Sequence, residues 1–287
     1  MRGNMTFLKK KRNTVCLIII LVFVIASLFV YPYIYQKICQ DRRYDDLGDK
    51  LNDDICSSNV RIVTEVIESN EDVDNFHYRE NGCGVIFAYE ENYYYVLTAA
   101  HVVDEKEKGN KTFYIVPYGS PTWQEANKKS KQETGKYLPS ETFYNQFEKA
   151  EVDYVSESCD IAIIRFKSDE QFKCLEIANN EVHYGDKLVA FGSSALSGSD
   201  ISYGKVVSKV YKTFDSHDGR NPDKVLFHNA YVVEGASGGA VLNEDFDIAG
   251  ITIGGGTDLI GRFKYGAFIP SGILKKVIQE WDANKTS

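Results

Sequence analysis

The stretch that decides the fold is Glu234-Gly235-Ala236-Ser237-Gly238-Gly239-Ala240, in which glycines surround a serine. Two earlier segments complete the pattern: Thr98-Ala99-Ala100-His101 ends one apolar run, and Cys159-Asp160-Ile161-Ala162 begins another. A serine in a glycine run means little alone. A histidine, an aspartate and a serine in this order, each in its own strand context, supply a general base, an orienting carboxylate and a nucleophile.

These three residue types suit acyl-transfer chemistry. A serine hydroxyl is a poor nucleophile at neutral pH, and histidine can take its proton because imidazole titrates close to neutrality. A buried carboxylate fixes the histidine tautomer and stabilises the imidazolium that forms. The glycines allow a tight turn, so that the N–H groups of Gly235 and Ser237 can meet the oxyanion of a tetrahedral intermediate.

Further motifs, in a consistent order along the chain, make the pattern specific. The chain resembles the trypsin-like, chymotrypsin-fold serine peptidases, and most of all their bacterial HtrA/Deg type. The supporting segments stand in family order and cover roughly residues 58–283: 82–87, 95–103, 160–164, 184–192, 201–208, 235–241 and 265–270. The resemblance implies that His101 is the general base, Asp160 the orienting residue and Ser237 the nucleophile. It assigns the oxyanion hole to Gly235 and Ser237.

The resemblance also implies the fold. We expect an all-β chain of two six-stranded antiparallel barrels with a C-terminal helix, preceded by an N-terminal transmembrane helix. Ala236 departs from digestive trypsin-like enzymes, which carry an aspartate there to bind a newly cut N-terminus, so that activation route looks closed. HtrA-type members usually have asparagine at this position and continue into a PDZ domain, whereas this sequence stops at Ser287. We therefore expect no PDZ-dependent substrate capture.

The resemblance places the pocket for the residue before the cut. Tyr231 lies six positions before Ser237, where trypsin-type enzymes carry an aspartate, and Val232 is beside it. Three glycines would form the walls: Gly254, Gly255 and Gly266. This predicts a shallow apolar pocket that favours small or medium apolar residues and offers no counter-ion to Lys or Arg. The alternative is that Tyr231 points into the barrel core.

The N-terminus predicts a membrane anchor. Residues 15–35 carry no charge over 21 residues, and a helix of that length spans a hydrocarbon core of about 30 Å. Five basic residues precede the run and no acidic residue occurs before Asp41, which predicts a cytoplasmic N-terminus and an extracytoplasmic catalytic domain. The alternative is a signal peptide cleaved near Ser27. The predicted organisation is a basic tail (1–14), an anchor (15–35), a stalk (36–57) and a peptidase domain (58–287).

Short apolar runs separated by turn signals predict the strands. They are expected at 60–66, 85–87, 93–97, 112–117, 147–154 and 160–166, and then at 187–191, 206–211, 225–228, 240–242, 248–253 and 263–269. Residues 119–140 are expected as a solvated surface loop or, alternatively, as a substrate-contacting or regulatory loop. A closing helix capped by Ser271 would bury one apolar face: Ile273, Leu274, Val277, Ile278 and Trp281.

The composition excludes several classes. A net charge of −8 argues against a nucleic-acid partner. The six cysteines form no C-x-x-C pair, so we expect neither a metal site nor a cofactor. Cys39 and Cys56 could bridge each other or a second copy, and Cys83 is interpreted as a packing residue. The other histidines are expected to be surface or hydrogen-bonded structural residues: His77, His183, His217 and His228.

Two classes of function remain open on the sequence. The favoured one is a membrane-anchored extracytoplasmic serine endopeptidase acting on polypeptides through an acyl-enzyme, because all three triad members are present. The other is a catalytically weak protease-fold binding module at the cell surface, because a fold does not fix a function. Esterase chemistry by the same triad is a further option. The N-terminal helix implies contact with membrane lipid, and a homo-oligomer stays open because HtrA-type enzymes often trimerise.

Overall fold

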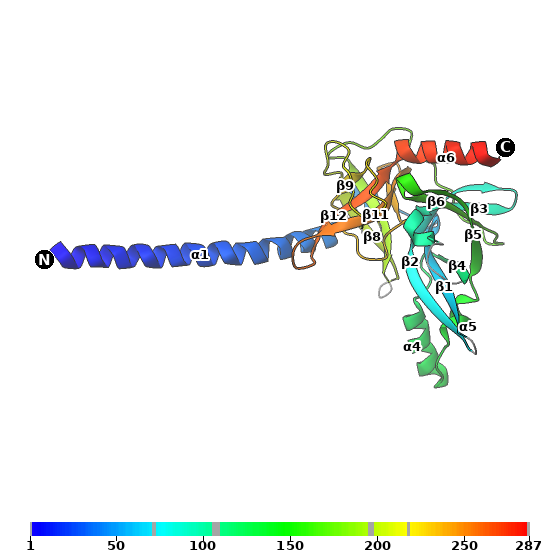
Figure 1. The fold of residues 1–287 in the computed structure, drawn as a ribbon, viewed down its shortest axis with the longest axis horizontal. Helices are drawn as coiled ribbons and strands as arrows, with labels where there is room; N and C mark the ends of the chain where they lie inside the picture. The colour runs from blue at the N-terminus through cyan, green and yellow to red at the C-terminus, as the bar shows by residue number, and fades with distance from the viewer. Residues whose placement is uncertain (1, 71–72, 105–109, 195–197, 217–218, 286–287) are drawn as a thin grey trace.

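The computed structural model describes residues 2–70, 73–104, 110–194, 198–216 and 219–285 (Figure 1). Six strands form a closed barrel in the order β1-β2-β3-β6-β5-β4. Their bounds are β1 Asn59–Asn70, β2 Val73–Glu90, β3 Tyr93–Ala99, β4 Asn110–Pro117, β5 Glu148–Ser156 and β6 Ile161–Phe166. Between β2 and β3, Glu91 and Asn92 both adopt positive φ (51° and 67°), as a two-residue hairpin turn requires.

The register of β3 against β6 fixes where the candidate base and its carboxylate emerge. Ala99 pairs with Ile161 at the end of the ladder. His101 follows Ala99 in a 3-10 turn, Ala100–Val103, and Asp160 directly precedes Ile161. Because the strands are antiparallel, the two segments leave the barrel at the same end.

The remaining six strands form a second antiparallel sheet in the order β8-β7-β10-β11-β12-β9. Their bounds are β7 Lys187–Ser194, β8 Gly198–Lys205, β9 Leu226–His228, β10 Ala240–Leu242, β11 Ile248–Thr257 and β12 Phe263–Pro270. The outer strands β8 and β9 meet near one end through an isolated bridge between Val206 and His228. The expected fold of two six-stranded units is confirmed, with the second sheet curled rather than fully paired into a barrel.

A long helix, α1 (Arg2–Gln40), projects from the two sheets (Figure 1). Its large aliphatic and aromatic side chains from Val15 to Ile34 are exposed, and in the described residues it is the one helix long and apolar enough to cross a membrane. The segment expected as a stalk contains two short helices, α2 (Asp45–Gly48) and α3 (Asp53–Ser57), which bury Leu47 and Cys56 in the main core. All six cysteines lie in the described residues and are free.

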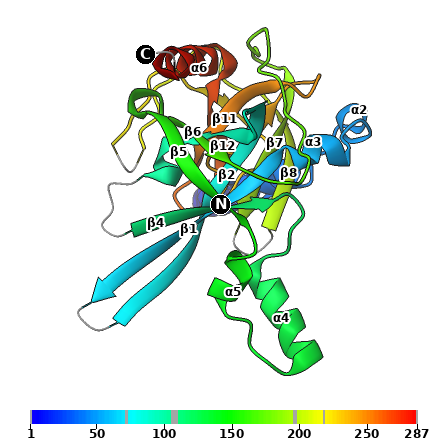
Figure 2. The same ribbon diagram turned by 90° about the vertical axis from the view of Figure 1, so that its right-hand side faces the viewer.

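Two expectations about secondary structure are wrong. Residues 119–140 are largely helical: α4 (Trp123–Thr134) is followed by α5 (Ser140–Tyr144), and both lie below the first barrel in Figure 2. Thr122 and Glu125 form a capping box at the start of α4, and Gly135 ends it with a φ of 72°. The other error is the strand expected at 206–211. The strand in this part of the chain is β8, which ends at Lys205, before the expected segment begins.

The C-terminal helix α6 (Ser271–Lys285) closes the fold, as expected (red in Figure 1). The side chains it buries are Ile273, Leu274, Val277 and Trp281. Trp281 Nε1 donates to Asp153 Oδ2 at 2.6 Å, which ties the helix to β5. The expected cap does not form, because Ser271 Oγ is buried without a hydrogen-bond partner in the described residues.

Candidate active site

A buried carboxylate orients the candidate base. His101 Nδ1 lies 2.8 Å from Asp160 Oδ2, and the His101 backbone N–H donates to Asp160 Oδ1 at 3.0 Å. The Asp160 side chain is 1% exposed, whereas that of His101 is 26% exposed. Because Nδ1 is held by the carboxylate, Nε2 is the ring nitrogen left to accept a proton.

The backbone of Asp160 is held in the left-handed region, with φ 52° and ψ 43°. Its N–H donates to Glu157 O at 3.3 Å, and its carbonyl accepts from Ala100 N–H at 3.1 Å. Aspartate tolerates this conformation better than most residues, although it still costs on the order of 1 kcal/mol. The tight bend is therefore a local device that places the carboxylate beneath His101.

Two successive turns present Ser237. They span residues 233–236 and 236–239, and in each the last N–H donates to the first carbonyl at 3.0 Å. Their third positions are Gly235 (φ 97°) and Gly238 (φ 83°), as a type II turn requires. Ser237 therefore occupies the second position of the second turn, between two glycines that adopt a backbone conformation costly for other residues.

The serine turn is attached to the first barrel beside His101. Cys83 N–H donates to Ser237 O at 2.7 Å. A Cβ placed on Gly82 would lie 2.5 Å from Ser237 O and 2.6 Å from Val102 Cγ2. The serine backbone and the residue after His101 thus both border Gly82, which brings all three candidate catalytic residues to one end of the barrel.

Cys83 and Thr98 support this turn from below. Cys83 Sγ donates to Gly235 O at 3.3 Å, and Thr98 Oγ1 donates to Cys83 O at 2.7 Å. A Cβ on Gly238 would collide with both Cys83 O and Thr98 Oγ1. Burial raises the pKa of the Cys83 thiol to about 12, which keeps the thiol protonated and able to donate. Cys83 is therefore more than the packing residue that the sequence suggested.

The backbone N–H groups of Gly235 and Ser237 donate to no group within the described part of the chain. Two such N–H groups, one of them the serine's own, are the donors that an oxyanion hole needs. In the same residues, no hydrogen bond joins Ser237 Oγ to His101. A catalytic hydrogen bond is often long before substrate binds, so proton transfer would need a small adjustment of the serine side chain.

Arg220, which sequence reasoning missed, braces the histidine–aspartate pair. Its guanidinium lies 2.5 Å from Asp104 Oδ2 and 2.9 Å from Glu157 Oε2, and its Nε lies 3.8 Å from Asp160 Oδ1. The Arg220 side chain is 8% exposed. Asp104 follows His101 by three positions, and Glu157 precedes Asp160 by three. No local motif marks Arg220, because its partners come from distant segments.

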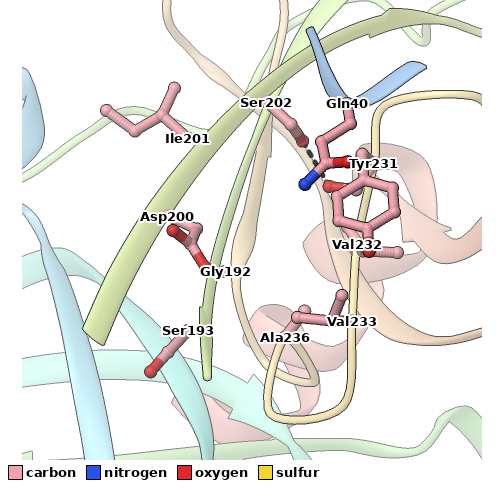
Figure 3. A pocket seen from close by; sticks show the side chains of 10 residues that line it. All are labelled: Gln40, Gly192, Ser193, Asp200, Ile201, Ser202, Tyr231, Val232, Val233 and Ala236. Atoms are coloured by element: carbon pink, nitrogen blue, oxygen red, sulfur yellow. Dashed lines mark hydrogen bonds between the residues drawn. The ribbon is translucent and has the colours of Figure 1, made fainter. Parts of the chain in front are cut away.

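The predicted pocket residues divide into two groups. Tyr231 and Val232 line a cavity of about 320 Å³, together with Ala236 and with Gln40 at the end of α1 (Figure 3). Figure 3 shows the Tyr231 ring across the cavity from Asp200, which lies on β8.

The three predicted wall glycines do not line this cavity, although two of them lie against Val232. A Cβ on Gly254 would lie 2.8 Å from Phe214 Cζ, while Cβ atoms on Gly255 and Gly266 would lie 3.7 and 3.0 Å from Val232 Cγ2. Tyr231 is half-buried and packs edge-on against Phe263 at 5.3 Å, so it is not enclosed in a barrel core. Whether these residues receive the substrate side chain stays a prediction.

His228 is buried near these glycines. It is 0% exposed, its ring nitrogens have no hydrogen-bond partner in the described residues, and burial lowers its pKa to about 4. It is therefore neither a surface residue nor a satisfied one, contrary to the sequence-based interpretation. His77 and His183 are exposed, as expected, and His217 lies outside the described residues. Among the residues that the structure describes, no cluster of side chains could hold a metal ion.

A family model for the trypsin-like peptidase domain matches residues 82–251, more than half of the chain. The chain belongs to this family. The match covers the candidate histidine, aspartate and serine segments. That the protein is of the HtrA type stays a prediction.

Solved structures share the fold of this trypsin-like peptidase. The MamO protease domain from Magnetospirillum magneticum (apo form) is 17% identical with a TM-score of 0.53, covering 79% of this chain and 98% of that one. Rv3671c from M. tuberculosis H37Rv (serine-to-alanine mutant, inactive form) is 16% identical with a TM-score of 0.55, covering 84% of this chain and 94% of that one. At such identities the likeness shows the fold alone. A comparison with curated proteins finds no match.

Proposed function

We propose that this trypsin-like peptidase is an active serine endopeptidase, anchored in a membrane by α1 and acting outside the cytoplasm. The observation that carries the proposal is the 2.8 Å contact between His101 Nδ1 and a fully buried Asp160 carboxylate. It lies at the same end of the barrel as a serine turn with two N–H groups that have no partner among the residues the structure describes. A base, an orienting acid, a nucleophile and oxyanion donors are the parts that peptide hydrolysis requires.

The proposed mechanism assigns one role to each group. Ser237 Oγ attacks the carbonyl carbon of the substrate while His101 Nε2 takes its proton, and Asp160 stabilises the resulting imidazolium. The N–H groups of Gly235 and Ser237 bind the oxyanion. His101 then gives the proton to the leaving amine, which leaves an acyl-enzyme on Ser237. Water, activated by the same histidine, hydrolyses the ester.

A serine-reactive fluorophosphonate probe tests the catalytic part. The wild-type chain in membranes should be labelled, and Ser237→Ala should not. Ser237→Ala and His101→Ala should each reduce peptide hydrolysis by several orders of magnitude. An unlabelled wild-type chain with an intact fold, shown by circular dichroism, would contradict the proposal.

A second candidate function is a binding module that retains the fold without turnover. The missing hydrogen bond between Ser237 Oγ and His101 favours it. The same probe separates the two functions, because a binding module would stay unlabelled at every pH. It would still bind polypeptides, and Ser237→Ala would bind them as tightly as the wild type.

The anchoring part has its own test. A protease added to intact cells should digest the domain beyond residue 58 and leave the N-terminal helix in the membrane fraction. The basic residues before Val15 favour this topology, since positive flanks stay in the cytoplasm. Release of the whole domain with a new N-terminus near Ser27 would show a cleaved signal peptide instead.

A further inference from the structure

The turn between β11 and β12 carries two large apolar side chains at its tip. Leu259 is fully exposed at 105% and Ile260 is 59% exposed. Single apolar residues on a surface are common and need no explanation. Two adjacent ones at a projecting tip indicate a contact surface when a second observation points to what covers them.

Most N–H groups of this turn, and its two charged side chains, are paired within it. Asp258 Oδ1 accepts from the N–H groups of Ile260 and Arg262, both at 3.0 Å, and Asp258 Oδ2 lies 2.7 Å from the Arg262 guanidinium. Asp258 N–H donates to Arg262 O at 2.8 Å, and Gly261 N–H donates to Asp258 O at 3.0 Å. Pairing most of its N–H groups and both charges lowers the cost of moving this turn out of bulk water, because unpaired polar groups are what make such transfer costly. The carbonyl groups at its tip would stay at the level of the headgroups, where water can reach them.

The second observation is a contact between this turn and α1. Arg262 Nη1 donates to Phe29 O at 2.7 Å, and the hairpin lies alongside α1 in Figure 1. Phe29 is six residues before Tyr35, the end of the predicted span, which corresponds to about 9 Å along a helix. Tyr31 and Tyr33 lie between them, and tyrosine rings favour the membrane–water interface. The tip therefore reaches the depth at which α1 leaves the bilayer.

We infer that Leu259 and Ile260 insert into the outer boundary between headgroups and acyl chains of the bilayer that α1 spans. The partner is a lipid surface, and the inference rests on the proposed anchoring by α1. Insertion gives the peptidase domain a second membrane contact besides the helix.

This second contact lies on the hairpin that also supports the nucleophile. On β11, Thr252 O accepts from Gly238 N–H at 2.7 Å, and Thr252 N–H donates to Gly239 O at 2.9 Å. The membrane contact and the serine turn are thus joined by one pair of strands. Insertion would fix the rotation of the domain about α1 and hold the active site at a set height above the lipid.

Quenching of tryptophan fluorescence by brominated acyl chains tests the inference on the full chain in nanodiscs. Leu259→Trp places the reporter at the tip. Phe23→Trp, in the middle of the apolar run, is the positive control. Tyr89→Trp is the matched negative control, because Tyr89 is 51% exposed beside the tip of the β2–β3 hairpin, away from α1 (Figure 1). The wild-type signal from Trp123 and Trp281 is subtracted.

Bromolipid should reduce the emission of Leu259→Trp by at least half and leave Tyr89→Trp unchanged. If Phe23→Trp is quenched while Leu259→Trp is quenched no more than Tyr89→Trp, the proposed insertion of the tip is contradicted. The proposed anchoring by α1 is then still supported. If Phe23→Trp is not quenched, the anchor fails and the inference fails with it. In Ile260→Trp, adding Leu259→Asp should weaken the quenching, and undiminished quenching would contradict insertion driven by the apolar tip.

Discussion

At the scale of single residues, the site depends on how two carboxylate oxygens are used. Asp160 Oδ2 faces the His101 ring, and Oδ1 accepts from the His101 backbone N–H. Arg220 lies on the Oδ1 side at 3.8 Å. One oxygen therefore sets the tautomer, and the other holds the carboxylate in place for it.

Asp160→Asn tests the tautomer argument. An amide can donate its N–H to Nδ1, which would place the histidine proton on Nε2, where the base must be free. We expect peptide hydrolysis to fall by a factor on the order of 10⁴ with the fold retained. The measurement is kcat on a peptide substrate, with circular dichroism as the folding control. A loss of less than tenfold would show that His101 does not act through Asp160.

Arg220→Met tests the brace beside the triad, with Arg165→Met as the control because Arg165 pairs with carboxylates on β5 away from the site. The positive charge of Arg220, 3.8 Å from Asp160 Oδ1, disfavours the positively charged imidazolium of His101 that the proposed mechanism requires. Its removal should shift the acidic limb of the kcat/KM profile to higher pH, while the loosened pair lowers kcat about tenfold. A lower kcat with an unchanged pH profile of kcat/KM would show that Arg220 acts only by holding the structure.

At the scale of elements, the serine turn requires glycine for two reasons, which are the positive φ and the lack of room for a Cβ atom. Gly238 has a φ of 83° and faces Cys83 O and Thr98 Oγ1 without room for a Cβ. Gly135, at the end of α4, has a φ of 72° but nothing within 4 Å. The two glycines share a positive φ and differ in the space around the missing Cβ.

Gly238→Ala and Gly135→Ala therefore form a matched pair. Gly135→Ala should lower the free energy of unfolding by about 1 kcal/mol, the cost of a left-handed alanine. Gly238→Ala should cost about 3 kcal/mol or more and abolish probe labelling, because the serine turn must move away from β2. Equal effects of the two substitutions would show that the contact with Cys83 is not needed. Thermal unfolding and labelling are the measurements.

The sequence was most informative where a local pattern carries the structure. His101 follows the apolar run that forms β3 and Asp160 precedes the one that forms β6, so the neighbouring residues alone placed both at strand ends. The capping box of α4 was equally local but was overlooked within a polar segment. β8 pairs with its chain neighbour β7, but its sequence offers only two large apolar residues, Ile201 and Tyr203, as a strand signal. The role of Arg220 depends on contacts with distant segments, and nothing around position 220 specifies them.

At the scale of the whole molecule, burial of one histidine makes stability depend on pH. His228 has a pKa of about 4 in the folded protein, because burial penalises its charged form, against an ordinary value of 6.5. The unfolded chain therefore binds a proton at a higher pH than the folded one. The contribution to stability is fully present above about pH 6.5 and is lost as the pH falls through 4.

The difference between these two pKa values corresponds to about 3 kcal/mol. Urea unfolding of the chain in detergent micelles, from pH 7.5 to pH 4, should show a loss of that size beyond the part due to carboxylates. His228→Leu keeps an apolar side chain of similar volume in the same place and cannot take up a proton. The difference in unfolding free energy between wild type and variant should therefore change by about 3 kcal/mol across this range, in favour of the variant at low pH. Parallel pH curves would mean that protonated His228 finds a hydrogen-bond acceptor in the folded protein when the pH falls.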